Sequence, residues 1–446
     1  MEYINPVEMR VVDKNSPYFG VAVDVLMENA GRAVYEELAK VAEEKRTFTI
    51  ISGTGNNGGD GFAAALHLHK SGYGLKVYIV GRKDDIGTEE ARMALKNLED
   101  AGVSVKEVAD AGEIDYGSDI IVDALLGTGI KGEVRSPMKE VIEGINRSKA
   151  YVVSVDVPSG LGTETVVDAD LVIALHMAKE GLEGYNTVVK DIGIPEKAST
   201  HVGPGHLIVN LRRDPASHKG ANGRVLVVAG SSAYSGAPIL TGLGAVGVGA
   251  DLVTLFVPEP ILNAARTYLP DFIFRGYAGD HLNPEAVKDI LDFSRGQDVC
   301  VVGPGLGTAD ETGEALNSIL KGMNIPVVLD ADALKLVDKK ALKNVNGVST
   351  PHATEFAGLT GDAPPEDLDG KKDVVRRLAV ELSMTVLFKS PVDIVASPEG
   401  RVKLNETGNA GMTVGGTGDA LAGAVGGFIA QGMDNFTAAC CAAFVN

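Results

Sequence analysis

The chain has 446 residues and a formal net charge of -19, with 45% hydrophobic and 23% charged residues. Its length indicates two or three domains of ordinary globular composition, and its acidic balance argues against a nucleic-acid-binding protein, because that affinity comes mainly from Lys and Arg. Three cysteines without a CxxC spacing argue against a disulfide framework and favour a reduced, cytoplasmic setting.

The first half of the chain alternates apolar strands with helical patterns. We predict an initial helix at about 21–44, strands at 47–51, 75–80, 119–125 and 151–157, and helices at 61–71, 88–101 and 136–146. The strands are continuously apolar, which indicates that both faces of their sheet are covered. This pattern predicts a Rossmann-like, doubly wound parallel α/β sheet.

The pattern pauses over a segment rich in Pro, Gly and polar residues, 191–223, and then restarts as a second α/β set. Strands are predicted at 224–231, 251–258, 298–307, 326–334, 385–390 and 393–397, followed by a last helix that reaches the final residue. The uncharged stretch 231–250 is interrupted by glycines and Pro238, so we interpret it as a buried loop and helix and expect no membrane span. Two domains are therefore expected, 1–211 and 212–446.

A polar, glycine-rich loop follows the first strand. In "SGTGNNGGDGF" (52–62) the residues Gly53, Gly55 and Gly58 satisfy GxGxxG before a helix, where backbone N–H groups can hold a phosphate. The end of the second strand reads "GRK" and lacks the acidic residue that binds a ribose, which disfavours a hydride-transferring dehydrogenase. The alternative is structural, with glycines for a tight turn and Asp60 as helix cap.

Two aspartates stand at the carboxyl ends of later strands, Asp123 and Asp156. Open α/β sheets bind ligands at these ends. Together with Asn57 and Ser159, Asp123 would offer hard oxygen ligands that suit an alkali or alkaline-earth cation. For each aspartate alone, a turn or capping role is an open alternative.

The segment "NAGMTVGGTGDALAG" (409–423) leads backbone N–H donors into a helix, with Asp419 where a Walker motif would have its lysine. A base beside an anion-binding loop suits phosphoryl transfer. The structural alternative is a first-turn carboxylate, which the helix dipole favours by about 0.3–1 kcal/mol. His352 with Glu355, and Lys389, follow nearby strands. A core histidine and a lysine that only extends toward solvent are their alternatives.

These motifs resemble, in order over nearly the whole chain, those of the bifunctional NAD(P)H-hydrate repair family. In that family an epimerase that acts on the hydrates of NADH and NADPH, written NAD(P)HX, is fused to a nucleotide-dependent NAD(P)HX dehydratase. "MENAGRAV", "GNNGGDG", "VDALLGTGIKG" and "VDVPSGL" resemble the epimerase half. "SHKGANGRVLVVAGS", "SGAP", "VGPGLG", "LDADAL", "TPHATEF" and "GNAGMTVGGTGDALAG" resemble the dehydratase half, which implies a ribokinase-like fold. The family usually continues past the last helix, so the final part of the nucleotide pocket is either missing from this sequence or supplied by other residues.

The resemblance implies the site residues. In the epimerase half the hydrated nucleotide would contact Asn56, Asn57, Gly58, Gly59, Asp60, Gly127, Thr128, Gly129, Ile130, Lys131, Gly132, Glu133 and Asp156, and potassium would be bound by Asn57, Asp123 and Ser159. In the dehydratase half the hydrate would contact Ala237, Gly305, His352 and Asp419. The adenine nucleotide, with magnesium, would contact Lys389, Ser390, Pro391, Val392, Asp393 and Gly418.

The expected activity is the repair of hydrated NADH and NADPH. The first domain would interconvert the R and S hydrates, with Asp156 as the candidate acid–base residue. The second would dehydrate the S form in an ADP-dependent reaction, with Asp419 as base, although ATP is an open alternative to ADP. We also expect a homo-oligomer that acts on small molecules. The rival interpretation is a ribokinase-like small-molecule or vitamin-precursor kinase fused to a nucleotide-binding or scaffold domain, and it leaves the first half unexplained.

Overall fold

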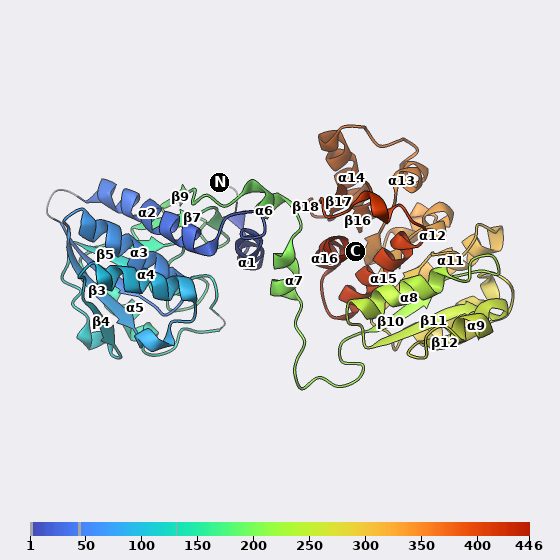
Figure 1. The fold of residues 1–446 in the computed structure, drawn as a ribbon, viewed down its shortest axis with the longest axis horizontal. Coiled ribbons are helices and arrows are strands. Elements are labelled where there is room, and N and C mark those ends of the chain that lie inside the picture. The colour runs from blue at the N-terminus through green and yellow to red at the C-terminus, as the bar shows by residue number, and fades with distance from the viewer. Residues whose placement is uncertain (1–2, 43–45, 131) are drawn as a thin grey trace. The chain divides into compact units, whose positions relative to one another are not determined.

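The computed structural model describes residues 3–42, 46–130 and 132–446. The chain divides into two compact units, Met1–Ala198 and Ser199–Asn446 (Figure 1). The second unit begins before the predicted boundary at 211/212 because the preceding segment already packs on it. Val202 N–H donates to Leu404 O at 2.8 Å, and helix α7 (Pro204–Asn210) contributes Leu207 to the core of the second unit.

The first unit is built on a parallel sheet of seven strands in the described residues, in the order β4-β3-β2-β5-β6-β7-β9. The strands are β2 (Thr47–Ser52), β3 (Gly74–Val80), β4 (Val105–Val108), β5 (Ile120–Ala124), β6 (Tyr151–Val155), β7 (Leu171–Leu175) and β9 (Thr187–Lys190). The order reverses between β2 and β5, and open α/β sheets bind ligands at such a switch point. The predicted doubly wound sheet is confirmed, and β4, β7 and β9 extend it beyond the four predicted strands.

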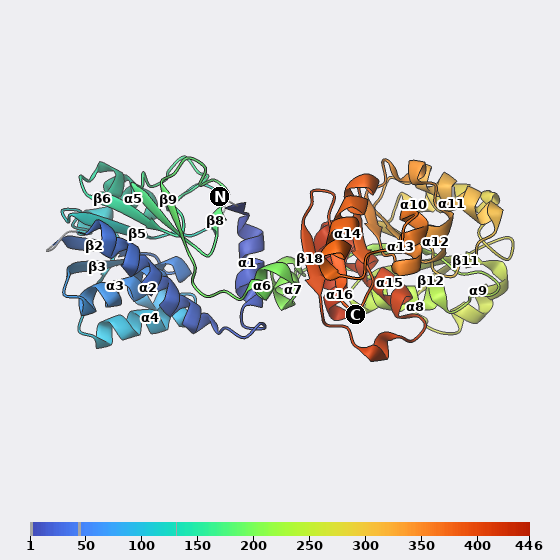
Figure 2. The same ribbon diagram turned by 90° about the horizontal axis from the view of Figure 1, so that it is seen from above.

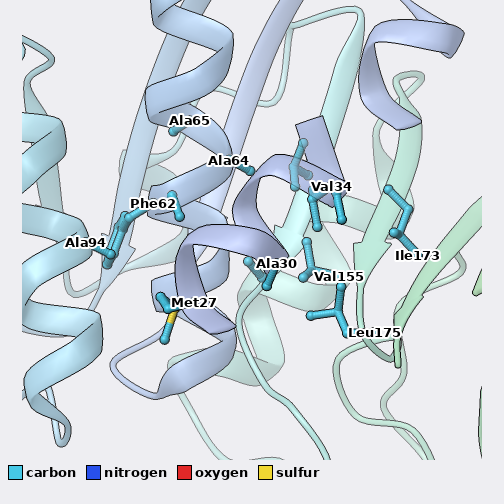
Figure 3. Packing of buried hydrophobic residues seen from close by; sticks show 14 of the residues in the cluster. Met27, Ala30, Val34, Phe62, Ala64, Ala65, Ala94, Val155, Ile173 and Leu175 are labelled. Atoms are coloured by element: carbon cyan, nitrogen blue, oxygen red, sulfur yellow. The ribbon is translucent and has the colours of Figure 1, made fainter. Parts of the chain in front are cut away.

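Helices cover both faces of this sheet. Helices α2 (Val23–Val41), α3 (Asn56–Lys70) and α4 (Glu89–Asp100) pack on one face, and α5 (Met138–Arg147) packs on the other. Figure 3 shows the first core, where Ala30 and Val34 of α2 lie beside Val155 of the sheet and Phe62 of α3 lies beside Ala94 of α4.

A short two-stranded sheet completes the first unit. Strand β1 (Tyr3–Ile4) pairs with β8 (Ala178–Lys179), so helix α1 (Pro6–Asn15) begins next to β8 (Figure 2). The side chain of Asn5 caps α1 by accepting from Val7 N–H at 3.0 Å and from Glu8 N–H at 2.9 Å. Helix α6 (Glu196–Thr200) follows β9 and spans the boundary between the two units.

The second unit has a nine-stranded sheet in the order β12-β11-β10-β13-β14-β15-β16-β17-β18. The strands are β10 (Arg224–Val228), β11 (Leu252–Pro258), β12 (Ile273–Tyr277), β13 (Val299–Val302), β14 (Val327–Leu329), β15 (Gly347–Ser349), β16 (Thr385–Phe388), β17 (Asp393–Ala396) and β18 (Val402–Asn405). Only the last two pairings are antiparallel. As in the first unit, the earliest strand lies third, so a switch point falls between β10 and β13.

Two layers of helices enclose the second sheet. Helices α8 (Ala237–Gly247), α9 (Glu259–Arg266), α15 (Thr417–Ala430) and α16 (Asn435–Val445) form one layer, and α10 (Val287–Ser294), α11 (Asp310–Gly322), α12 (Asp332–Leu336), α13 (Ala353–Thr360) and α14 (Leu368–Leu382) form the other. Helices α8 and α15 approach closely through glycine, because a Cβ at Gly423 would lie 1.8 Å from Thr241 O. In the part of the chain that the structure describes, no helix is long and apolar enough to cross a membrane.

Candidate functional sites

Asn57, Asp123 and Ser159 come from three separate motifs and meet at the switch point of the first sheet. Ser159 Oγ donates to Asp123 Oδ1 at 2.5 Å, and Ser159 N–H donates to Asp123 Oδ2 at 2.9 Å. Leu126 joins the third residue to this pair, because its carbonyl accepts from Asn57 Nδ2 at 3.3 Å and its N–H donates to Ser159 Oγ at 2.9 Å.

One oxygen of this group lacks a partner. Asn57 Oδ1 is buried and accepts no hydrogen bond from the described residues. Burying a carbonyl oxygen without a hydrogen-bond donor costs free energy. The position of Asn57 Oδ1 therefore favours the binding of a cation or of a hydrogen-bond donor there. The nearby Asp123 is completely buried, and burial raises the pKa of its carboxyl despite hydrogen bonds from Ser159 and Ser154. An all-oxygen set with one orphaned acceptor and one carboxylate fits a hard cation such as potassium.

Glycines bring the two polar loops of this site into contact. A Cβ at Gly53 would lie 2.0 Å from Leu125 O, and one at Gly58 would lie 2.0 Å from Gly53 O. A Cβ at Gly127 would stand 3.6 Å from the Cβ of Asn57. A side chain at Gly53 would push the two loops apart, and one at Gly58 would collide with the backbone of Gly53 in its own loop.

The remaining predicted contacts of the epimerase half lie in these loops or beside them. Asn56 begins α3 and its Oδ1 accepts from Thr88 Oγ at 2.6 Å. Thr128 and Ile130 are half-buried, Gly58 and Gly59 are buried, and Gly129 and Gly132 are exposed. Glu133 accepts from Glu164 N–H at 3.2 Å, which directs it to the 163–165 segment. Lys131 lies outside the described residues.

Asp60 is not the helix cap that the structural alternative required. Helix α3 begins at Asn56, five residues earlier than predicted, and Gly55 is its N-cap. The five polar and glycine residues 56–60 therefore form the first turns of the helix and not a loop. Burial, and then the charges of Asp156 and Asp13, raise the pKa of Asp60 well above its usual range.

Asp156 follows β6 in a left-handed backbone conformation, with φ of 65°. Its N–H donates to Ile173 O at 2.8 Å, and its Oδ1 accepts from Leu175 N–H at 3.1 Å. Lys179 Nζ also donates to this oxygen and to Leu175 O at 2.6 Å. Because the Lys179 side chain is only 2% exposed, the lysine and Asp156 form a fixed pair at the sheet edge.

The second unit has a lysine–aspartate pair of its own. Lys389 Nζ donates to Asp330 Oδ1 at 2.6 Å, and Thr350 Oγ donates to the same oxygen at 2.7 Å. Glu355 Oε2 lies 3.8 Å from Lys389 Nζ, and burial raises the pKa of Glu355. Lys389 is thus an ion-paired residue, and the alternative of a lysine that only extends toward solvent is wrong.

His352 caps helix α13. Its Nδ1 accepts from the N–H groups of Thr354 and Glu355 at 3.1 and 3.2 Å, and its own N–H donates to Glu355 Oε2 at 2.9 Å. An accepting Nδ1 leaves the ring proton on Nε2, which lies 3.3 Å from Glu355 Oε1. The alternative of a core histidine is wrong, because the side chain is 48% exposed.

Asp419 stands in the first turn of α15 without capping it. Gly416 is the N-cap, with φ of 97°, and the helix has no side-chain cap. The N–H groups of this first turn have no partner within the helix. Burial, and then the charge of Asp330, raise the pKa of Asp419 to about 6. Gly418 precedes it and lies against the lysine, since a Cβ there would be 3.4 Å from Lys389 Nζ.

Two further predicted residues pack against one another. A Cβ at Gly305 would lie 2.9 Å from the Cβ of Ala237, and the φ of Gly305 is +65°. Gly244 holds α8 to the start of α15, because a Cβ there would lie 2.0 Å from Ala420 O. The first residue of α8, Ala237, therefore belongs to the same end of the sheet as Asp419.

The predicted nucleotide segment forms a braced turn beside a cavity. Ser390 N–H donates to Asp393 Oδ1 at 3.0 Å, Ser390 Oγ donates to Val392 O, and Asn405 Nδ2 donates to Asp393 Oδ2 at 3.0 Å. The adjoining cavity has a volume of about 570 Å³. It is lined by His352, Ala353, Thr354, Pro364, Pro365, Glu366, Lys371, Phe388, Lys389, Ser390 and Pro391.

Comparisons with known proteins match both units. A family model described as YjeF-related protein N-terminus matches residues 23–181, and one described as NAD(P)H-hydrate dehydratase matches residues 225–446. The bifunctional NAD(P)H-hydrate repair enzyme of Methanothermobacter thermautotrophicus is 40% identical, over 99% of this chain and 90% of that protein. The chain belongs to the bifunctional NAD(P)H-hydrate repair enzymes.

A second repair enzyme has a similar sequence identity, and a solved dehydratase structure is more distant. The repair enzyme of Methanopyrus kandleri is 39% identical over 99% of this chain and 91% of that protein. The crystal structure of an ADP/ATP-dependent NAD(P)H-hydrate dehydratase from Bacillus subtilis, obtained with ATP and Mg²⁺, is 26% identical and covers 55% of this chain and 87% of that one, with a TM-score of 0.47. The two family models, the identity to the repair enzymes and the two observed parallel sheets confirm the predicted family and the predicted α/β fold of both units. Because relatives match both halves, the rival of a kinase fused to a scaffold domain loses its support.

Within this repair-enzyme fold, three residues of the two sites were not predicted. Asp330 and Lys179 complete the two lysine–aspartate pairs. Asp13 is the third residue, and burial, followed by the charge of Asp156, raises its pKa. Asp330 carried a usable signal, since it ends a predicted strand in "LDADAL" just as Asp123 and Asp156 end theirs. Lys179 and Asp13 carried none, because only the pairing of β1 with β8 brings them to the site.

Proposed function

We propose that this chain repairs hydrated NADH and NADPH. Domain 1–211 interconverts the R and S hydrates, and domain 212–446 dehydrates the S hydrate with ADP as phosphoryl donor. The observation that carries the proposal is the pair of distinct sites on one chain. An oxygen group with an orphaned acceptor lies in the first unit, and a base beside a lysine and an open helix N-terminus lies in the second.

The chemistry of dehydration explains why a kinase-like fold serves it. The hydrate has a hydroxyl on the carbon beside the ring nitrogen, and hydroxide is a poor leaving group. Asp419 takes the hydroxyl proton while the oxygen forms a bond to the phosphoryl group and the bond to ADP breaks. The nitrogen lone pair then expels phosphate and NAD(P)H is formed. A base with a pKa of about 6 is ionised at neutral pH and contributes about 10²–10⁴-fold.

Lys389 and the N–H groups at the start of α15 face the charge that moves with the phosphoryl group. We propose that the nucleotide occupies the cavity of about 570 Å³ beside Lys389, a volume within the range of about 300–1,000 Å³ typical of small-molecule sites. No three acidic, histidine or cysteine side chains in the described ranges could hold a metal ion together. Magnesium would therefore be held mainly by the nucleotide phosphates, whose charge it neutralises when bound.

In the epimerase unit Asp156 is our candidate acid–base residue. Asn57, Asp123 and Ser159 would hold potassium, which when bound supplies positive charge near the anionic nucleotide. The ion would also satisfy Asn57 Oδ1, which is otherwise unpartnered. Asn57→Ala should therefore abolish the potassium dependence of epimerisation.

We further propose a cytoplasmic homo-oligomer. All three cysteines are buried and none forms a disulfide bond, which suits a reducing compartment. Light scattering on the purified chain tests the oligomeric state, and a monomer at micromolar concentration would remove that part of the proposal.

Recovery of NADPH absorbance from purified NADPH hydrate tests the function. We expect recovery with Mg²⁺ and ADP, a slower reaction with ATP, and none without nucleotide. A stable phosphorylated product without NADPH would instead identify a small-molecule kinase. Faster recovery with ATP than with ADP would reverse the proposed donor preference and leave the repair function in place.

A further inference from the structure

Helix α1 carries an acidic residue, Asp13, that interacts electrostatically with Asp156 and Lys179 and that the proposed chemistry does not use. Strand β1 pairs with β8 so that Ile4 lies opposite Lys179, and Glu180 N–H donates to Ile4 O at 3.0 Å. Helix α1 follows directly and has Asp13 in its last turn. The strand that positions Lys179 therefore also positions the helix that carries Asp13.

Asp13, Asp60, Asp156 and Lys179 form one electrostatic group, since the charges of Asp156 and Lys179 act on both Asp13 and Asp60. Lys179 is committed to Asp156, and among the described residues neither Asp13 nor Asp60 accepts a hydrogen bond. Three ionised carboxylates would thus share one ammonium. Like charges in partly dehydrated surroundings disfavour that state, which is one reason that the pKa values of Asp13 and Asp60 are raised.

The two unpaired carboxyls differ in how they hold a proton. Burial, and then the charges of Asp156 and Asp13, raise the pKa of Asp60 well above its usual range, which favours its protonated form. Loss of hydration, and then the charge of Asp156, raise the pKa of Asp13 to about 6, which lets it gain and lose a proton near neutrality. The atoms that surround Asp13 reduce its hydration, yet the residue keeps an exposed surface. The other charged or titratable neighbours are Lys14, which lowers the pKa of Asp13, and His176, whose pKa is lowered by burial and by Lys179.

An independent observation marks this end of the sheet as a ligand site. Asn57 lies on the same first turns of α3 as Asp60, and its buried Oδ1 has no partner in the described residues. The acidic group therefore adjoins a site whose polar atoms already require a ligand.

We propose that Asp13 is the second acid–base residue of the epimerase site and works together with Asp156. The proposal rests on the epimerase function proposed above. Asp13 in its protonated form donates to the hydroxyl oxygen of the hydrate, the carbon–oxygen bond breaks and water leaves. The nitrogen lone pair forms a C=N bond, giving an iminium ion.

Water then adds to the opposite face of that carbon and gives a proton to the carboxylate of Asp156, while the C=N electron pair returns to nitrogen. Solvent returns the proton from Asp156 to Asp13. No electrons are gained or lost over the cycle, and one water leaves for each that adds. Two carboxyls explain how a single site could serve both faces of the ring, since each residue acts as acid in one direction and base in the other.

The test measures conversion of pure R-NADPHX to the S form by the full-length chain. We expect Asp13→Asn to lower kcat for conversion by about 10²-fold with little change in KM. Dehydration of pure S-NADPHX with ADP should stay at the wild-type rate. Asp13→Glu, which restores a carboxyl, should recover part of the rate. The matched control is Asp24→Asn on α2, an exposed aspartate, which should leave both rates unchanged.

The pH profile separates proton transfer from a structural role. In the wild type we expect a limb with an apparent pKa near 6 that Asp13→Asn removes, whereas damage to the position of α1 would lower the rate equally at every pH. If Asp13→Asn does not fold, the limb is measured in Asp13→Glu, where it should move.

A wild type that does not interconvert the hydrates would remove the proposed epimerase function itself. A wild type that does, with Asp13→Asn within about twofold of it and the same pH profile, would overturn only the inference about Asp13. An unmoved limb in Asp13→Glu would also overturn it.

Discussion

In the first unit Lys179 donates to Asp156 and is 2% exposed, whereas in the second Lys389 donates to Asp330 and is 20% exposed. Both pairs stand at the carboxyl ends of parallel strands, near switch points formed by the same strand order. The exposed member of the pair differs. In the first unit it is the carboxylate, with Asp156 18% exposed, and in the second it is the lysine, since Asp330 is only 2% exposed.

This difference matches the two proposed reactions. An accessible carboxylate supported by a buried lysine suits proton exchange at a carbon that carries a hydroxyl. An accessible lysine supported by a buried aspartate suits a phosphoryl group, and the open N-terminus of α15 adds donors to it. We propose that the same α/β framework supports two chemistries because the exposed member of the ion pair differs between the units.

Among variants that separate the reactions of the two units, we expect the largest change in rate for Asp419→Asn. Removal of the base should lower ADP-dependent dehydration by about 10²–10⁴-fold. Interconversion of the R and S hydrates should continue at the wild-type rate. The measurement is NADPH absorbance recovery for the first and chromatographic separation of the hydrates for the second. Near-normal dehydration would show that Asp419 is not the base.

The reciprocal change is Asp156→Ala, which should slow R-to-S conversion by about 10²-fold while dehydration of pure S-hydrate is unaffected. Because the alanine leaves the buried Lys179 unpaired, Asp156→Asn serves as its control, since an amide oxygen can still accept from Leu175 N–H. Normal conversion in a folded Asp156→Asn variant would contradict an acid–base role.

The pH dependence of dehydration should follow Asp419. The carboxylate acts as a base only when ionised, and its pKa is raised to about 6 by burial and by Asp330. The value of kcat/KM should therefore be flat above about pH 7 and fall about tenfold per pH unit well below 6. The measurement is kcat/KM for dehydration of the S hydrate at saturating ADP, taken from about pH 5 to about pH 8. A flat profile through this range would contradict the assignment.

The smallest effect concerns the packing that aims α15. Gly423→Ala would place a Cβ 1.8 Å from Thr241 O, so α8 and α15 must separate. We expect a loss of about 1–3 kcal/mol in the free energy of unfolding, measured with urea. Gly247→Ala is the matched control on α8, because a Cβ there meets nothing within 4 Å. Equal stability of the two variants would contradict the close approach.

Local patterns in the sequence predicted much of this arrangement. Continuous apolar runs predicted the buried parallel strands, and polar residues at strand ends predicted that Asp123 and Asp156 lie at the same edge of the first sheet, because parallel strands end at one edge. The small residues after Asp419 predicted a close helix contact, which Gly423 makes.

Other features depend on contacts that no local pattern encodes. The start of α3 was placed five residues late, since two asparagines and two glycines are poor helix formers and packing of Gly53 and Gly58 overrides that tendency. The partners of the charged groups were also missed. Lys179 reaches Asp156 across 23 residues and Lys389 reaches Asp330 across 59, through pairings that only the folded sheet creates.

The most direct test of two complementary sites on one chain uses an equal mixture of R- and S-NADPHX with excess ADP and Mg²⁺. The wild type should return all of the hydrate, R and S, to NADPH. Asp156→Asn should convert the S form rapidly and leave the R form to its slow spontaneous epimerisation, and Asp419→Asn should yield almost no NADPH. Wild-type recovery that stops when the S form is exhausted, or that does not require nucleotide, would contradict the proposal of two complementary sites.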